Sequence, residues 1–200
     1  MKKTLLSLIT ASVLTTLLTI PVGAAEVGTL DDKKHSVETE YYIDKFGDEV
    51  IEETHYNKEG DIVEVSVEKE ETVFPEQTGE FSIQSGVYHA ASRSSVTSRI
   101  EAKWGQLRIY ANGFSDSYTS SSKSTKKAID KISVNTSLIM NGSVENQASD
   151  NRTKSSLANA SAAQQRFMVP TAPQYSRSSH SYHNSGANSV YHSTEAKRGF

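Results

Sequence analysis

Residues 62–73 alternate between apolar and polar side chains. Val63, Val65 and Val67 share one parity, and Glu64 and Ser66 hold the other. A repeat of two residues is typical of a β-strand with one buried and one wet face. The pattern therefore predicts a strand over this segment.

Two short segments of similar composition precede this strand. Asp44–Asp48 and Asn57–Asp61 each begin with Asp or Asn and have Gly in fourth position. An Asx side chain caps a tight turn, and Gly accepts the positive φ that such a turn requires. The turns predict a three-stranded meander at 36–43, 49–56 and 62–73. Its expected packing residues are Tyr42, Val50, Tyr56, Val63 and Val65.

The second turn, Tyr56–Asp61, resembles the YD-type repeats of bacterial surface and toxin-shell proteins, in which a tyrosine precedes an Asx-x-x-Gly turn. In the first turn the tyrosine does not directly precede the Asx residue, because Ile43 separates Tyr42 from Asp44. With two units and this interruption, we interpret the likeness as shared turn chemistry, without a shell.

Beyond residue 86 the chain is rich in Ser, Thr and Asn, yet its apolar residues still alternate with polar ones. Asn141–Gly142 adds a strong hairpin signal, because a type I′ turn needs positive φ at both central residues. The alternating sets are Val96, Ile100, Ala102 and Trp104, then Leu107, Ile109 and Ala111, then Ile132, Val134, Leu138 and Met140.

Weaker strand signals follow at 157–163, 167–169, 175–183 and 189–195. Six or seven short strands in about 110 residues predict an all-β fold, an immunoglobulin-like two-sheet sandwich preceded by the acidic meander. The competing interpretation is a disordered Ser-rich tail.

The N-terminus is typical of a secretory signal peptide. Lys2 and Lys3 precede an apolar run from Leu5 to Ile20, and small residues follow Pro21. The run is shorter than the ~20 residues that span a bilayer, which favours cleavage near residue 25 over an uncleaved anchor. We therefore expect a secreted protein without a transmembrane segment after processing.

Charge divides the rest of the chain. Residues 26–80 carry 18 Asp and Glu against 5 Lys, whereas residues 81–200 carry 6 against 14 Lys and Arg. The breakers in 75–80 lie where the sign changes. We therefore divide the chain into a signal peptide at 1–25, an acidic region at 26–80 and a basic, Ser-rich domain at 81–200. Either the acidic region masks the basic domain, or the two regions are solvated modules whose surfaces differ in charge.

The sequence contains no catalytic or cofactor-binding motif that we can assign. Cysteine is absent, which excludes disulfides and thiolate zinc sites. There is no G-x-S-x-G elbow, phosphate loop or dinucleotide fingerprint, and Asp116 and Asp130 are isolated. We predict a protein that is not an enzyme and uses no cofactor.

Histidines supply the remaining candidate chemistry. A hairpin centred on Gly186 would place His180 opposite His192 on one sheet face, with His183 on the other. Two imidazoles could begin a metal site, but only Glu195 is a plausible further ligand. Surface histidines bonded to serines are the competing interpretation, so we assign no metal ligand.

Lys123, Lys126, Lys127 and Lys131 form a basic stretch in a Ser-rich loop. They suit either contact with anionic cell-wall polymers or phospholipid headgroups, or plain solubilisation. They lack the interleaved aromatic residues of a nucleic-acid groove, so no nucleic-acid partner is expected.

Four segments of the Ser-rich region, Ile100–Trp104, Ile132–Val134, Asn141–Ser143 and Ser179–Tyr182, resemble small exported β-sandwich proteins of Gram-positive bacteria. The resemblance implies extracellular location and a sandwich fold, and carries over no catalytic residue. We expect a secreted, noncatalytic binding protein of the extracellular space or cell envelope. The alternative is a bacteriocin-like or toxin-like protein with an acidic pro-segment, and a weaker one is a metal-binding exported protein.

Overall fold

The computed structural model describes residues 36–44, 47–74, 87–101, 106–166 and 172–199. The expected signal peptide, the 75–80 boundary, and the strand positions at Ala102, Trp104 and 167–169 lie outside the described residues. Within those residues, no helix is long and apolar enough to cross a bilayer.

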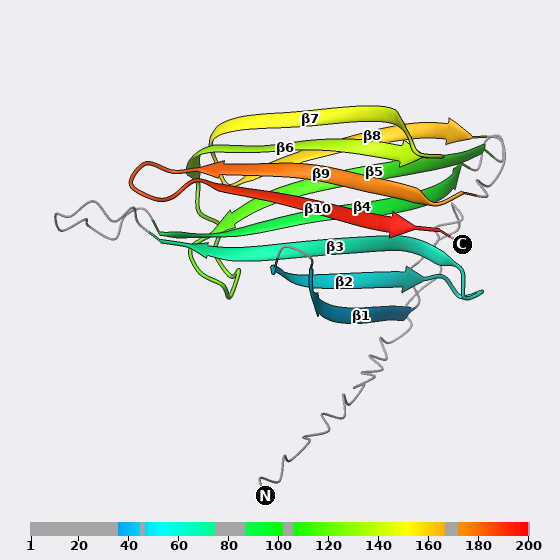
Figure 1. The fold of residues 1–200 in the computed structure, drawn as a ribbon, viewed down its shortest axis with the longest axis horizontal. Coiled ribbons are helices and arrows are strands. Elements are labelled where there is room, and N and C mark those ends of the chain that lie inside the picture. The colour runs from blue at the N-terminus through cyan, green and yellow to red at the C-terminus, as the bar shows by residue number, and fades with distance from the viewer. Residues whose placement is uncertain (1–35, 45–46, 75–86, 102–105, 167–171, 200) are drawn as a thin grey trace, which may run out of the picture.

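The described chain is all-β and forms two antiparallel sheets that pack as a β-sandwich (Figure 1). One sheet has the strand order β1-β2-β3-β4-β5-β8, and the other has the order β10-β9-β6-β7. The strands are β1 Ser36–Ile43, β2 Glu49–Tyr56, β3 Ile62–Val73, β4 Tyr88–Glu101, β5 Gln106–Tyr118, β6 Ile129–Met140, β7 Ser143–Ser155, β8 Leu157–Arg166, β9 Gln174–His183 and β10 Val190–Arg198.

The acidic meander has the strand bounds that its pattern predicts. Gly47 and Gly60 adopt φ of 89° and 88° in the two turns. The Asn57 side chain accepts a hydrogen bond from the Asp61 amide at 2.8 Å, which closes the second turn. Val50, Val63 and Val65 are buried and Tyr56 is half-buried, but Tyr42 is 42% exposed. The packing role expected for Tyr42 was wrong, because β1 lies beyond the second sheet.

Strand β3 joins the acidic and Ser-rich regions in one sheet. It pairs with β4 along its length, with Val65 opposite Val96 and Val73 opposite Tyr88. The inward side chains of β3 also enter the core, since Val67 and Val73 belong to its two apolar clusters. The change of charge near residue 80 therefore does not coincide with a break in the sheet.

The Ser-rich region supplies the seven strands from β4 to β10, in place of a disordered tail. Asn141 and Gly142 both have positive φ, 54° and 75°, which confirms the hairpin between β6 and β7. The hairpin of β9 and β10 places His180 opposite His192 and Tyr182 opposite Val190, as its sequence predicts.

The four-stranded sheet covers β3, β4, β5 and β8, while β1 and β2 extend past its β10 edge (Figure 1). Two apolar clusters lie between the sheets, one around Tyr88 and Tyr182 and the other around Ile109 and Leu138. Between the clusters the inward positions are polar. We call this set the buried polar layer, in which all members except the half-buried His192 are buried: Ser92, Ser94, Ser115, Thr136, Ser178, His180, His192 and Thr194.

Candidate binding surfaces and the buried polar layer

His180 lies at the centre of the buried polar layer. Its Nδ1 bonds to Ser115 Oγ at 2.9 Å and its Nε2 to Thr194 Oγ1 at 2.8 Å. Ser94 Oγ lies 2.6 Å from the same Thr194 hydroxyl. Burial, followed by the nearby charge of His192, lowers the pKa of His180 to about 3. The imidazole therefore stays neutral and links strands of both sheets through hydroxyl groups.

His192 occupies a second chain of hydrogen bonds that resembles a hydrolytic triad. Ser92 Oγ bonds to His192 Nδ1 at 2.8 Å, and His192 Nε2 lies 3.1 Å from Glu71 Oε2. However, Ser92 is 0% exposed and also bonds to the Tyr182 hydroxyl at 2.7 Å. A nucleophile must reach its substrate and an oxyanion hole. Ser92 is packed between the sheets, so we interpret the hydrogen bonds among Ser92, His192 and Glu71 as structural.

The histidine pair shares one sheet face, as the sequence predicts, but each ring already has hydroxyl or carboxylate partners. His183 is exposed on the opposite face and bonds to Ser189 Oγ at 3.0 Å. In the described part of the chain, no group of three or more His, Asp and Glu side chains gathers as a metal site would require. Glu195 pairs with Arg177 on the exposed side of β10, away from the imidazoles of His180 and His192.

Three lysines of the basic loop are held by other parts of the chain. Lys123 bonds to Glu68 at 3.2 Å and also to Glu70, both on β3. Lys126 pairs with Asp116, and Lys127 donates to the Val87 carbonyl. Contact of this loop with an anionic polymer stays a prediction, and the structure shows that these three lysines also have partners within the chain.

Lys131 instead lies on the outward side of β6, within a surface that we call the polar face. The polar face consists of the outward side chains of the four-stranded sheet, most of which carry hydroxyl, amide or cationic groups. They are Tyr191, Ser193, Glu195 and Lys197 on β10, Tyr175, Arg177, Ser179, Ser181 and His183 on β9, Lys131, Ser133, Asn135, Ser137 and Ile139 on β6, and Val144, Gln147, Ser149, Asn151 and Thr153 on β7.

The polar face has a net positive charge. Lys131, Arg177 and Lys197 are exposed, and its one acidic member, Glu195, pairs with Arg177 at 2.5 Å. Tyr191 is 78% exposed and projects from the β10 edge. Cationic groups bind phosphates and carboxylates, while hydroxyl and amide groups hydrogen-bond to polyols. The arrangement suits an anionic ligand rich in hydroxyl groups.

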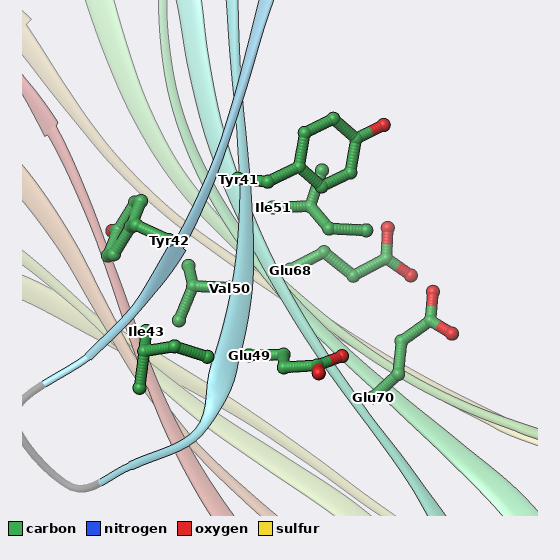
Figure 2. Close-up of a pocket in the computed structure, with 8 residues that line it drawn as sticks. All are labelled: Tyr41, Tyr42, Ile43, Glu49, Val50, Ile51, Glu68 and Glu70. Atoms are coloured by element: carbon green, nitrogen blue, oxygen red, sulfur yellow. The ribbon is translucent and has the colours of Figure 1, made fainter. Parts of the chain in front are cut away.

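A pocket of about 450 Å³ lies on the meander. Figure 2 shows Tyr41 and Ile51 beside Glu68 and Glu70 on one side of the strands, with Tyr42 and Val50 on the other. Ile43 and Glu49 also line it. The sequence analysis missed this pocket, although the adjacent apolar residues Tyr41 to Ile43 interrupt the alternation and mark an outward apolar side.

An ion-pair cluster on the other side of the meander fixes its first turn. Lys69 Nζ on β3 lies 2.5 Å from Asp44 and 2.9 Å from Asp48, on either side of Gly47. Burial alone would lower the pKa of Lys69, but the hydrogen bonds to both carboxylates outweigh it and raise that pKa above its ordinary value. The pairs attach the β1–β2 turn to β3.

Comparisons with known proteins provide no relative from which a role can be transferred: no protein-family model, curated protein or solved structure matches the chain. A proposal for the function must therefore rest on the surfaces described above.

His180 makes stability depend on pH. Its folded pKa of about 3 lies below the ordinary 6.5, so the unfolded chain binds a proton first as the pH falls. This histidine therefore removes about 1.4 kcal/mol of stability per pH unit below about 6.5. We expect urea unfolding to show about 3 kcal/mol lost from this source between pH 7.5 and 4.5, and His180→Gln to reduce that loss.

His183→Gln is the matched control, because it removes an exposed imidazole from the same strand. It should leave the pH dependence of the unfolding free energy unchanged. Equal pH dependence in the wild-type protein and His180→Gln would contradict the assignment.

Proposed function

We propose that this chain is an exported, noncatalytic protein that binds an anionic, hydroxyl-rich polymer of the cell envelope through its polar face. The observation that supports this proposal is the composition of that face, where Lys131, Arg177 and Lys197 lie among exposed hydroxyl and amide groups. The exposed outer surface of the meander carries glutamates, so an anionic polymer would be directed toward the polar face.

The geometry of a sheet suits a polymer with a short repeat. Neighbouring strands lie about 4.8 Å apart, and outward side chains recur about every 6.7 Å along each strand. Outward side chains also form rows across the strands β6, β9 and β10. One row consists of Ser133, Ser181 and Tyr191, and the next consists of Asn135, Ser179 and Ser193. A repeating ligand can therefore meet hydroxyl or amide groups at successive positions.

Export and the finer fold type belong to the same proposal. The segment before residue 26 has the composition of a secretory signal, and the seven strands β4 to β10 have immunoglobulin-like proportions. Intact mass of the protein recovered from culture medium tests the export step. We expect a chain that begins near residue 25 or 26, and recovery of the full 200-residue chain would contradict cleavage.

The bacteriocin-like alternative requires that residues up to about 80 leave the active protein. Such processing would take β3 out of the sheet, although Val67 and Val73 lie in the core clusters. This observation favours a protein that retains its acidic region. A secreted mass that begins near residue 80 would support the alternative.

Cosedimentation with washed Gram-positive cell walls tests the binding proposal directly. The test variant combines Lys131→Ser, Arg177→Ser and Lys197→Ser, and the control combines Lys58→Ser, Arg93→Ser and Arg108→Ser away from the polar face. Both lower the net charge by three. We expect the test variant to bind about tenfold more weakly, which corresponds to ~1.4 kcal/mol of lost contact energy, and the control to bind within about twofold of wild type.

Salt and wall composition separate specific from general binding. Affinity should fall as ionic strength rises, because exposed charges are screened. It should also fall when the anionic polymers are extracted from the walls. Equal binding by the test variant, the control variant and the wild-type protein would contradict a role for the polar face.

A further inference from the structure

Among the strands that the structure describes, β1 is an open edge of the six-stranded sheet. It pairs with β2 on one side, and all of its eight residues are exposed. An edge strand presents a row of unpaired N–H and C=O groups, which are a template for pairing with another chain. The edge is therefore available for main-chain hydrogen bonds.

Main-chain groups on other strand edges of the sandwich form hydrogen bonds with side chains of the facing sheet. At β8, the Asn159 amide donates to Asp150 at 3.0 Å, and Asn146 of β7 donates to the Ala163 carbonyl at 2.9 Å. At β10, Ser94 donates to the Thr194 carbonyl at 3.2 Å. Among the described residues, β1 stands apart as an edge without such cover.

The two sides of β1 differ in chemistry. Val37, Thr39, Tyr41 and Ile43 share one side, where Tyr41 is 76% exposed and Ile43 62%, and where Glu68 and Glu70 also line the pocket. Glu38, Glu40 and Tyr42 occupy the opposite side. A strand added to β1 would place its own alternate side chains against these two surfaces. One set would meet the apolar side chains of Val37, Tyr41 and Ile43, and the other would meet Glu38 and Glu40 beside Tyr42.

Charge on the acidic side favours a cationic occupant. Glu40 lies directly opposite Glu52 on β2, and like charges at facing positions destabilise a strand pair. Burial raises the pKa of Glu52, the hydrogen bond from Tyr42 opposes that shift, and repulsion from Glu40 adds to it. A cation held beside Glu40 would offset this repulsion.

The same charges oppose a second copy of this chain. Two β1 strands paired about a two-fold axis near Thr39 would place Glu38 opposite the Glu40 of the other copy, and an axis at Glu40 would pair it with itself. Between residues 36 and 74, leaving out 45 and 46, there are 13 Asp and Glu against 2 Lys. The acidic edge thus favours a basic partner over self-association.

We propose that β1 receives an extended segment of a partner protein in which Lys or Arg alternates with apolar residues, so that the segment becomes a seventh strand of the sheet. Main-chain hydrogen bonds to β1 supply much of the affinity, and the pocket and the glutamates select the alternating pattern. This docking edge is separate from the polar face, so either surface can fail its test without the other.

Fluorescence anisotropy with a labelled peptide tests the proposal on the full chain. The probe is a ten-residue peptide of alternating Lys and Val. A peptide of the same composition with five Lys followed by five Val, and a second with Glu in place of Lys, serve as controls. We expect at least about tenfold tighter binding of the alternating Lys peptide, and new hydrogen-exchange protection at 36–43 in the complex.

Tyr41→Ser should weaken binding of the alternating peptide about tenfold, and Glu40→Gln about threefold. The matched control is Tyr191→Ser, because Tyr191 is 78% exposed on a different strand, and it should leave the affinity unchanged. Equal affinity for the block peptide, a lack of protection at β1, or an effect of Tyr191→Ser equal to that of Tyr41→Ser would overturn the proposal. Dimer formation through β1, measured by sedimentation, would also overturn it.

Discussion

A chain that begins at residue 81 is expected not to fold. This truncation removes β3, which lies between β2 and β4 in the sheet and buries Val65, Val67 and Val73. Full burial of one valine contributes about 1.5–3 kcal/mol, so the three together are comparable to the 5–15 kcal/mol that stabilises a typical domain. The ten-residue pairing of β3 with β4 is lost as well.

Urea unfolding followed by circular dichroism, with size-exclusion chromatography, measures this effect. The control is a chain that begins at residue 36, which keeps every described strand. The control should unfold cooperatively, whereas the chain from residue 81 should show no cooperative transition and an expanded hydrodynamic radius. A transition within about 1 kcal/mol of the control would contradict the role assigned to β3.

Gly113→Ala is expected to destabilise the protein by about 3 kcal/mol or more, because β5 and the four-stranded sheet approach closely at this residue. A Cβ atom on Gly113 would lie 2.0 Å from Thr136 Oγ1 and 2.7 Å from both Ser178 Oγ and Val134 Cγ2. These contacts are far inside van der Waals distance, so the sheets must separate locally or the side chains must leave their rotamers. The urea midpoint measures the loss.

A double-mutant cycle identifies the cause of that loss. Thr136→Ala removes the nearest atom, so the combination of Gly113→Ala with Thr136→Ala should show a favourable coupling of about 1 kcal/mol or more. Simple additivity, or a Gly113→Ala protein within about 0.5 kcal/mol of wild type, would contradict the close approach.

Local patterns in the sequence predicted most of the strands. The meander followed from the spacing of Gly47 and Gly60 after Asp44 and Asn57, because an Asx-x-x-Gly turn leaves little freedom in strand length. The β9–β10 register followed from the position of Gly186 in the loop. In each case the information lies within about ten residues.

Partners that lie far apart in the sequence could not be predicted in this way. Ser92, Ser94 and Ser115 occupy inward positions, where serine gives no local sign of burial. Their hydroxyls are satisfied by Tyr182, Thr194 and His180, 90, 100 and 65 residues along the chain. Alternation showed that these strands have two faces, but it did not show that the buried face is itself partly polar.

The candidate surfaces depend on the same distant contacts. Lys123 pairs with Glu68, which lies 55 residues away in the sequence. The composition of the loop could not show that β3 holds this lysine. The polar face arises because β6, β7, β9 and β10 lie in one sheet, which no single segment reveals. The pocket likewise requires β1, β2 and β3 to be adjacent.

The buried polar layer also affects the mechanical behaviour of the protein. Attraction between apolar side chains has no preferred direction, whereas a hydrogen bond is lost when its atoms separate by an ångström or two. His180 and Thr194 bond across the interior to Ser115 and Ser94, so shear along the strands must break these bonds together. The layer therefore resists a force that slides one sheet over the other.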